Sequence, residues 1–220
     1  MLIVSQPKTY VNSEIEGVFW YYTLMQKRHR IFIAINLPHE VKKFLSGFQK
    51  KFNGIPAKWT PKDNLHITLL FLGDLTDEEL GQACVEIKEV VKNHTSFNIE
   101  LNKIMYGPDN KIPFDTTQGK PPRMIWASGE KNKEVSQLKN NLEDALLEKI
   151  NFKPDNKLFS PHVILARIST FLWRQIEPEE RPEVSENINI SFTVETIEVM
   201  ESVLKRGKPE YLIIESYNLK

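Results

Sequence analysis

The sequence has few of the features that mark secreted, membrane-bound or disulfide-stabilised proteins. It contains one cysteine, Cys84, in 220 residues, which excludes both an internal disulfide and a cysteine-based metal site. It has no run of about 18 apolar residues, and its first 30 residues lack a basic start followed by an apolar core and a cleavage site. We therefore expect a soluble, cytoplasmic protein with no membrane partner.

The sequence also lacks net charge, because 29 basic side chains balance 29 acidic ones. It does not have the bulk positive charge of a duplex nucleic-acid binder, so any nucleic-acid substrate must be held locally. The chain is long enough and apolar enough to form a buried core, since it has 220 residues of which 40% are hydrophobic.

Hydrophobic periodicity divides the chain into an N-terminal extension and a core. Residues 1–29 show no sustained period, and we expect them to lie outside the core, as a genuine appendage or the product of a mis-assigned start with Met25 as the alternative. Residues 30–220 are expected to form a single domain.

Helices are predicted after Pro38, after the capping-box residue Thr76, and around Val135 to Ile150. Strands are predicted at 30–38, 64–73, 97–107, 123–129, 160–168, 190–202 and 211–219, with residues 53–64 forming a loop.

Two apolar runs headed by histidine give the sharpest functional signal. In the first run, His66 and Thr68 are two residues apart, so a strand places both on one face. In the second run, His162 is followed on its face by Ile164. A lone H-x-T pattern carries little weight, because five histidines give roughly 0.5 matches to H-x-T or H-x-S by chance. A single histidine in a strand is also often there for structural reasons, with its ring hydrogen-bonded to a backbone carbonyl. The repeated order of helix, polar loop and histidine strand instead suggests two similar lobes that face each other across a shared cleft.

The ordered motifs of residues 30–219 resemble the two-histidine (2H) phosphoesterase superfamily, specifically its RNA 2′,3′-cyclic phosphodiesterase or 2′-5′ RNA ligase branch. The resemblance rests on five segments: "RIFIAINLP", "NLHITLLFLG", "RMIWA", "PHVILARI" and "IEVMESVLKRGKPEYLII". It implies an α+β class and a bilobal fold, with two antiparallel sheets and flanking helices around a central cleft. It also implies hydrolysis of a terminal 2′,3′-cyclic phosphate to a 2′-phosphate without a metal or other cofactor, together with possible reversible 2′-5′ RNA ligase activity. The expected partners are RNA or nucleotide ends with a 2′,3′-cyclic phosphate, and we expect a monomer.

The resemblance assigns roles to residues of this sequence. Imidazole can act as acid or base near neutral pH, and His66 would be the general acid toward the 3′ oxygen while His162 would be the general base. The residues alone leave open which histidine is which. Thr68 and Arg167 would bind phosphate oxygens. Arg167 falls opposite His162 in a regular strand, so a twist or bulge is needed to bring it to the phosphate.

One position departs from the family pattern, because Ile164 stands where the second motif has Thr or Ser. The missing hydroxyl predicts a weakened or retuned enzyme. Two alternatives remain: a non-catalytic binder of cyclic-phosphate or nucleotide ends, and a sister phosphoesterase that acts on 2′-5′ oligonucleotides or ADP-ribose cyclic phosphate. A histidine-based metal site is less favoured, since no third ligand has a recognisable spacing from either motif.

Overall fold

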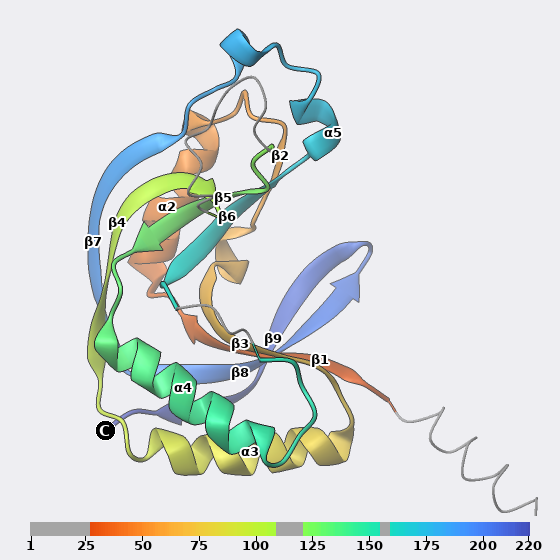
Figure 1. Ribbon diagram of the computed structural model, residues 1–220, viewed down its shortest axis with the longest axis vertical. Coiled ribbons are helices and arrows are strands. Elements are labelled where there is room, and N and C mark those ends of the chain that lie inside the picture. The colour runs from red at the N-terminus through yellow and green to blue at the C-terminus, as the bar shows by residue number, and fades with distance from the viewer. Residues whose placement is uncertain (1–26, 109–120, 155–158) are drawn as a thin grey trace, which may run out of the picture.

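The computed structural model describes residues 27–108, 121–154 and 159–220 (Figure 1). Most of the predicted N-terminal extension, residues 1–26, lies outside the described residues. The first strand begins at His29, which is 7% exposed. Its Nδ1 lies 2.8 Å from a Glu201 carboxylate oxygen and its Nε2 lies 2.9 Å from an Asp77 carboxylate oxygen. Because these contacts fix His29, the strand starts one residue before the predicted boundary at residue 30.

In the described part of the chain, nine strands form a single antiparallel sheet that consists of two halves. They are β1 (His29–Asn36), β2 (Ala57–Trp59), β3 (His66–Leu75), β4 (Phe97–Gly107), β5 (Met124–Gly129), β6 (His162–Ile168), β7 (Ser185–Val194), β8 (Thr196–Lys205) and β9 (Lys208–Asn218). Their order is β7-β4-β5-β6-β3-β1-β8-β9, and β2 pairs with β6. We call β7-β4-β5-β6 with β2 the β6 half, and β3-β1-β8-β9 the β3 half.

The two halves are joined through one register pair, Ile67 of β3 opposite Val163 of β6. Figure 1 shows β4 and β7 running steeply while β1, β3 and β8 run almost horizontally, so the halves turn away from each other beyond this junction. The predicted α+β class is confirmed. The two sheets that were expected are the two halves of one hydrogen-bonded sheet.

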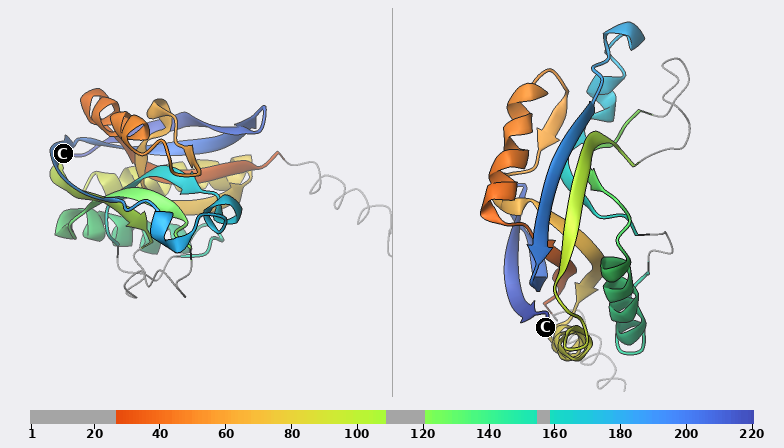
Figure 2. Two further views of the ribbon diagram at one scale, coloured as in Figure 1. Left: turned by 90° about the horizontal axis from the view of Figure 1, so that it is seen from above. Right: turned by 90° about the vertical axis from the view of Figure 1, so that its left-hand side faces the viewer.

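The helices cover the sheet in two places. They are α2 (His39–Lys51), α3 (Asp77–Val91), α4 (Lys133–Leu147) and the short α5 (Thr170–Trp173), with the 3-10 helices η1 (Lys62–Asn64) and η2 (Pro178–Glu180). Helices α3 and α4 pack on each other and on the β3 half, whereas α2 contacts η1 and β6. Figure 2 shows α2 and α4 on opposite sides of strands β4 and β7. No helix among the described residues has both the length and the apolar content needed to cross a membrane.

Local sequence signals explain where several elements begin and end. The capping box that was predicted at Thr76 is present: the Glu79 amide donates to the Thr76 hydroxyl over 3.2 Å, and the Thr76 amide donates to the Glu79 carboxylate over 2.8 Å. The turn between β8 and β9 has positive φ at Arg206 (50°) and Gly207 (73°), as a two-residue type I′ hairpin requires.

Two predictions of secondary structure were incomplete. Residues 57–59, expected within a loop, form β2, because their backbone pairs with the edge of β6. The single strand predicted at 190–202 is two strands, β7 and β8, which separate at Glu195. A local pattern of alternating residues does not reveal either feature, since both depend on which distant strand is available for pairing.

Candidate active site

His66 lies at the first position of β3, and only Leu65 separates it from η1. Its Nδ1 donates to the Asn64 carbonyl oxygen over 2.7 Å, which leaves Nε2 as the acceptor of the neutral ring. The Thr68 hydroxyl donates to that Nε2 over 3.0 Å. The predicted pair His66 and Thr68 therefore shares one face and is in direct contact.

His162 lies at the first position of β6 and has the same backbone arrangement. Its Nδ1 donates to the Ser160 carbonyl oxygen over 2.9 Å, again two residues upstream. The ring stacks on Trp126 of β5, with centroids 4.0 Å apart and an interplanar angle of 26°. In the neutral form both histidines have the same tautomer, with Nδ1 protonated and Nε2 available for proton transfer.

The junction between the halves brings the two histidines close together. Because Ile67 pairs with Val163 in antiparallel register, His66 and His162 are diagonal neighbours across the junction, which in regular sheets means a separation of about 7–8 Å. A positive charge on His162 also contributes to lowering the pKa of His66. We call the sheet face that carries His66, Thr68 and His162 the histidine face.

A β-bulge places Arg167 on the histidine face. Strand β6 pairs Ile164 with Trp126 and Ala166 with Ile125, so Leu165 is an extra residue in β6. After this bulge the alternation of β6 is reversed, and Arg167 pairs with Met124, which is on the same face of β5 as Trp126. The sequence predicted that Arg167 could share a face with His162 only if β6 contained a twist or a bulge. The bulge at Leu165 brings Arg167 to that face.

Ile164 also lies on the histidine face, where it is half-buried beside Trp126. The position of the missing hydroxyl is thus within the site. Arg167 is exposed, and its guanidinium contacts the Met124 sulfur over 3.6 Å.

Both histidines have a lowered pKa. Burial lowers the pKa of His66 to about 4; the hydrogen bond to Asn64 opposes this shift, and the positive charges of Lys42, Arg167 and His162 add to it. Burial also lowers the pKa of His162, against the opposing effect of the Ser160 carbonyl. The free protein therefore holds both rings neutral at pH 7, and a bound anion would raise both pKa values.

A group of aromatic side chains that was not predicted from the sequence lies on the β3 side of the histidine face. The rings of Phe32, His66 and Tyr211 contact one another with centroids 5.0 to 5.1 Å apart. Phe71, which is 64% exposed, lies 6.1 Å from Phe32. A bulge at Leu69 reverses the alternation of β3, so Phe71 shares the face of His66 although regular alternation predicts the opposite face.

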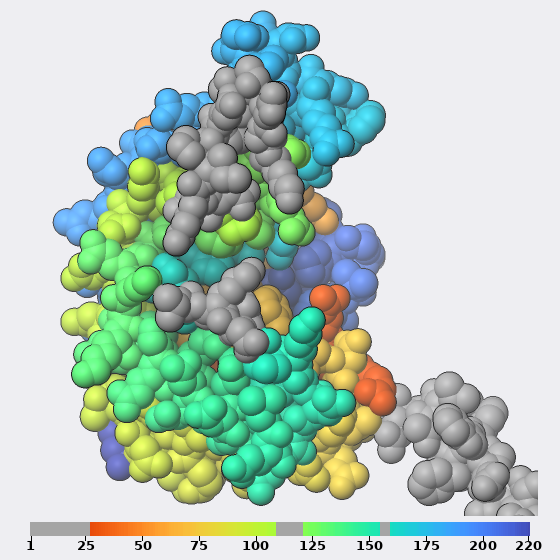
Figure 3. Space-filling view, viewed as in Figure 1, coloured from red at the N-terminus to blue at the C-terminus, as the bar shows by residue number. Residues whose placement is uncertain are grey.

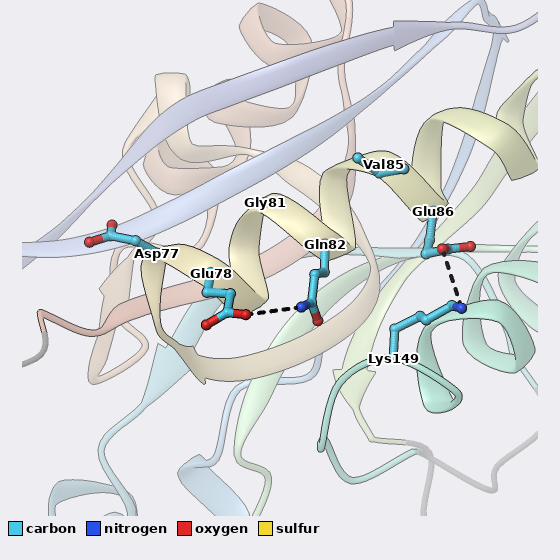
Figure 4. A pocket seen from close by; sticks show the side chains of 7 residues that line it. All are labelled: Asp77, Glu78, Gly81, Gln82, Val85, Glu86 and Lys149. Carbon is cyan, nitrogen blue, oxygen red and sulfur yellow. Dashed lines mark hydrogen bonds and ion pairs between the residues drawn. The ribbon is translucent and has the colours of Figure 1, made fainter. Parts of the chain in front are cut away.

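Two depressions of the described surface are lined by residues other than the predicted site residues. One lies on α3, where Glu78 accepts from Gln82 and Glu86 pairs with Lys149 (Figure 4). Helices α3 and α4 form the lower surface of the molecule in the space-filling view (Figure 3). The described residues also contain no group of three or more His, Cys, Asp or Glu that is arranged to hold a metal ion.

Two histidine-headed strands that meet at one register pair are the arrangement expected of a two-histidine phosphoesterase. Comparisons with known proteins agree with this class. A family model described as LigT like Phosphoesterase matches residues 35–113. The chain is 26% identical to the RNA 2′,3′-cyclic phosphodiesterase of Methanocaldococcus jannaschii over 189 residues, which cover 86% of this chain and 99% of that protein. It is 28% identical to the RNA 2′,3′-cyclic phosphodiesterase of Thermus thermophilus over 196 residues, which cover 87% and 90% of the two chains.

Solved structures support the same fold. The crystal structure of TT0787 from Thermus thermophilus superimposes with a TM-score of 0.71 at 27% identity, covering 86% of this chain and 97% of that one. The structure of E. coli LigT complexed with 3′-AMP superimposes with a TM-score of 0.68 at 23% identity, covering 87% and 98%. In sequence and in fold the chain is similar to the LigT-like phosphoesterases, and the resemblance that the sequence motifs indicated is confirmed.

Proposed function

We propose that this cyclic phosphodiesterase opens the 2′,3′-cyclic phosphate at the end of an RNA and leaves a 2′-phosphate. The observation that carries the proposal is the diagonal placement of His66 and His162 at the junction of the two halves, each with Nδ1 bonded to a carbonyl. Relatives that align over most of this chain share the name RNA 2′,3′-cyclic phosphodiesterase, which supports the substrate class. The exposed ring of Phe71 and the ring of Tyr211 are surfaces of the type on which nucleobases stack.

The reaction needs one base and one acid. His162 takes a proton from water through Nε2, and the water oxygen attacks phosphorus. The bond from phosphorus to the 3′ oxygen breaks, and His66 gives that oxygen a proton from its Nε2. The assignment of His66 as acid follows the family resemblance. Since the pKa of free His66 is about 4, the negative charge of the bound substrate must raise it before His66 can donate.

Thr68 changes partner when His66 becomes protonated. In the free protein its hydroxyl donates to the Nε2 of His66. A protonated Nε2 no longer accepts, so the hydroxyl is free to donate to a non-bridging phosphate oxygen. Arg167 supplies charge-assisted donors to the same phosphate, where negative charge builds up in the transition state.

We propose further that the protein acts as a cytoplasmic monomer, needs no metal or other cofactor, and also catalyses the related reversible 2′-5′ RNA ligation. Each point has its own measurement. Turnover that is unchanged in a chelator supports metal independence. Joining of an RNA with a cyclic phosphate end to an RNA with a 5′-hydroxyl supports ligation, and sedimentation gives the oligomeric state.

The central test is incubation of the protein with an RNA that bears a 2′,3′-cyclic phosphate, followed by separation of 2′- from 3′-phosphate products. A 2′-phosphate product is expected. A 3′-phosphate product would reverse the leaving oxygen, and no product would refute hydrolysis.

A second candidate is favoured by Ile164, which lies on the histidine face without a hydroxyl. In this case the protein binds cyclic-phosphate or nucleotide ends without turnover. Binding of the RNA with no product over many hours would support this candidate. Hydrolysis of 2′-5′ oligonucleotides or ADP-ribose cyclic phosphate in preference to the RNA end would instead identify a sister phosphoesterase.

A further inference from the structure

Strand β2 adds a lysine to the histidine face. Its three residues Ala57, Lys58 and Trp59 pair with Ile168, Arg167 and Ala166 of β6. Ala57 and Trp59 pack against the main hydrophobic core, whereas Lys58 is exposed. Since directly paired residues of neighbouring strands project from the same face, Lys58 projects beside Arg167.

This pairing sets two positive charges directly opposite each other. Like charges at such positions destabilise a sheet, and natural strands usually place opposite charges there. Among the described residues no carboxylate forms an ion pair with Lys58 or Arg167, so the repulsion is not offset within this part of the protein. An arrangement of this kind becomes favourable when an anion lies between or beside the two cations.

The positive charge extends along this side of the site. Lys42 and Arg167 both lower the pKa of His66. With Lys58, three cations lie around one end of the histidine face in a protein whose net charge is zero. A cyclic phosphate carries a single negative charge, which the histidines and Arg167 already match. The remaining positive charge points to a second phosphate.

We propose that Lys58 binds the backbone phosphate that joins the terminal nucleotide of the substrate to its 5′ neighbour. This inference rests on the proposed function and refines it, because the phosphate concerned exists in an RNA chain and is missing from a mononucleotide 2′,3′-cyclic phosphate with a 5′-hydroxyl. Strand β2 thus makes the enzyme selective for polynucleotide ends, while Arg167 remains on the terminal phosphate.

The test compares two substrates in two variants. The substrates are a short RNA with a 2′,3′-cyclic phosphate end and the mononucleotide 2′,3′-cyclic AMP. In Lys58→Ala the ratio of kcat/KM for the RNA to that for the mononucleotide should fall by about three- to tenfold. The dependence of log kcat/KM for the RNA on log salt concentration should become shallower by about 0.7. Lys88→Ala, which removes an exposed lysine on α3, is the matched control and should leave the ratio and the salt dependence unchanged.

The outcomes separate this inference from the proposed function. An unchanged ratio in Lys58→Ala, with the RNA hydrolysed normally, would refute the role of Lys58 and leave the proposed function intact. If wild-type protein hydrolyses neither substrate, the proposed function fails, and the inference is then decided by binding of an RNA that ends in a 3′-phosphate. Weaker and less salt-dependent binding by Lys58→Ala than by Lys88→Ala would support the phosphate contact; equal binding would refute it.

Lys58→Glu tests the geometry by stability. A glutamate opposite Arg167 replaces repulsion by attraction, so the melting temperature should rise above that of wild-type protein, while turnover of both substrates should fall because Arg167 is engaged. A melting temperature at or below the wild-type value, in a variant with native circular dichroism, would show that the two side chains do not face each other and would overturn the proposal.

Discussion

Phe71 and Arg167 occupy equivalent positions in the two halves of the sheet. Each lies five residues after the histidine that heads its strand, and each follows a one-residue bulge, at Leu69 in β3 and at Leu165 in β6. The two bulges turn both side chains onto the histidine face. The site is therefore symmetric in backbone and asymmetric in chemistry, with an aromatic ring beside His66 and a guanidinium on the His162 side.

The paired histidines lead to the first prediction. His66→Ala and His162→Ala should each reduce turnover of an RNA 2′,3′-cyclic phosphate by about 10²–10⁴-fold, because neither histidine can supply both proton transfers. Circular dichroism and melting temperature should show a folded protein in both cases. His39→Ala, which changes an exposed histidine at the start of α2, is the control and should retain full turnover. Near wild-type activity in either site variant would contradict the two-histidine mechanism.

The second prediction concerns Arg167, whose positive charge lowers the pKa of His66 and, in the proposed mechanism, also holds the substrate phosphate. Arg167→Ala should lower turnover by about 10- to 150-fold, the value expected when a charge-assisted hydrogen bond in the transition state is lost. It should also raise the pKa of His66, since one of the charges that lowers it is removed. The histidine ring signals in an NMR titration measure this pKa directly. Arg174→Ala, an exposed arginine after α5, should change neither quantity.

The sequence predicts the parts of this site that come before the bulges in β3 and β6, but not the side chains that follow those bulges. The two histidine strands and the helix start at Thr76 follow from local patterns. The helix cap lies where it was expected, and the strands begin at His66 and His162, two residues after the predicted starts at 64 and 160. The face of Arg167 does not follow, because strict alternation assigns it to the opposite side and the position of a bulge depends on the register of the partner strand. Phe71 was missed for the same reason.

Strand β2 was missed for a different reason. It has only three residues, lies between Pro56 and Pro61, and has no apolar alternation long enough to recognise. It forms because β6 has an edge on this side to which the segment can bond: the Thr60 amide donates to the Leu165 carbonyl over 2.9 Å, and the Ser169 amide donates to the Pro56 carbonyl over 2.8 Å. Only the folded β6 half shows that Lys58 lies beside Arg167.

The third prediction is a pH dependence of stability that arises from His66. Its pKa falls from 6.5 to about 4 on folding, so between these values the unfolded chain binds more protons than the folded protein. The contribution of His66 to the free energy of unfolding is therefore complete above pH 6.5, declines as the pH falls toward 4, and changes no further below that value. Urea unfolding at pH 7 and at pH 4.5 should show a smaller loss of stability for His66→Gln than for wild-type protein. An equal loss in both proteins would mean that the ring is not buried in solution as it is in this structure.

The fourth prediction concerns the N-terminal segment. Removal of residues 1–24 should leave turnover unchanged and shift the melting temperature by less than about 2 °C, because the segment has no periodic apolar face with which to pack on the core. The truncated chain keeps His29 and its contacts with Asp77 and Glu201. His29→Ala is the comparison and should lower the melting temperature by several degrees. A similar decrease on truncation would show that the aromatic residues 19–22 stabilise the domain.

The last prediction concerns Ile164, which shares the histidine face with Thr68 but has no hydroxyl to donate to a phosphate oxygen. Ile164→Thr should raise turnover about tenfold or more, since it restores a hydrogen bond to a charged group. Threonine is β-branched and suits a strand, so the pairing of β6 with β5 should persist.

The substitution also has a cost, because Ile164 is half-buried against Trp126 and a hydroxyl without a partner there would destabilise the protein by about 1–3 kcal/mol. Turnover and unfolding free energy must therefore be measured on the same preparations. Ile164→Val, which removes a methylene without adding a hydroxyl, separates the two effects: it should reproduce part of the change in stability and none of the gain in rate. If Ile164→Thr folds, binds the RNA end and turns over no faster than wild-type protein, the hydroxyl is not what limits this enzyme, and another donor, such as Arg167, already holds that phosphate oxygen.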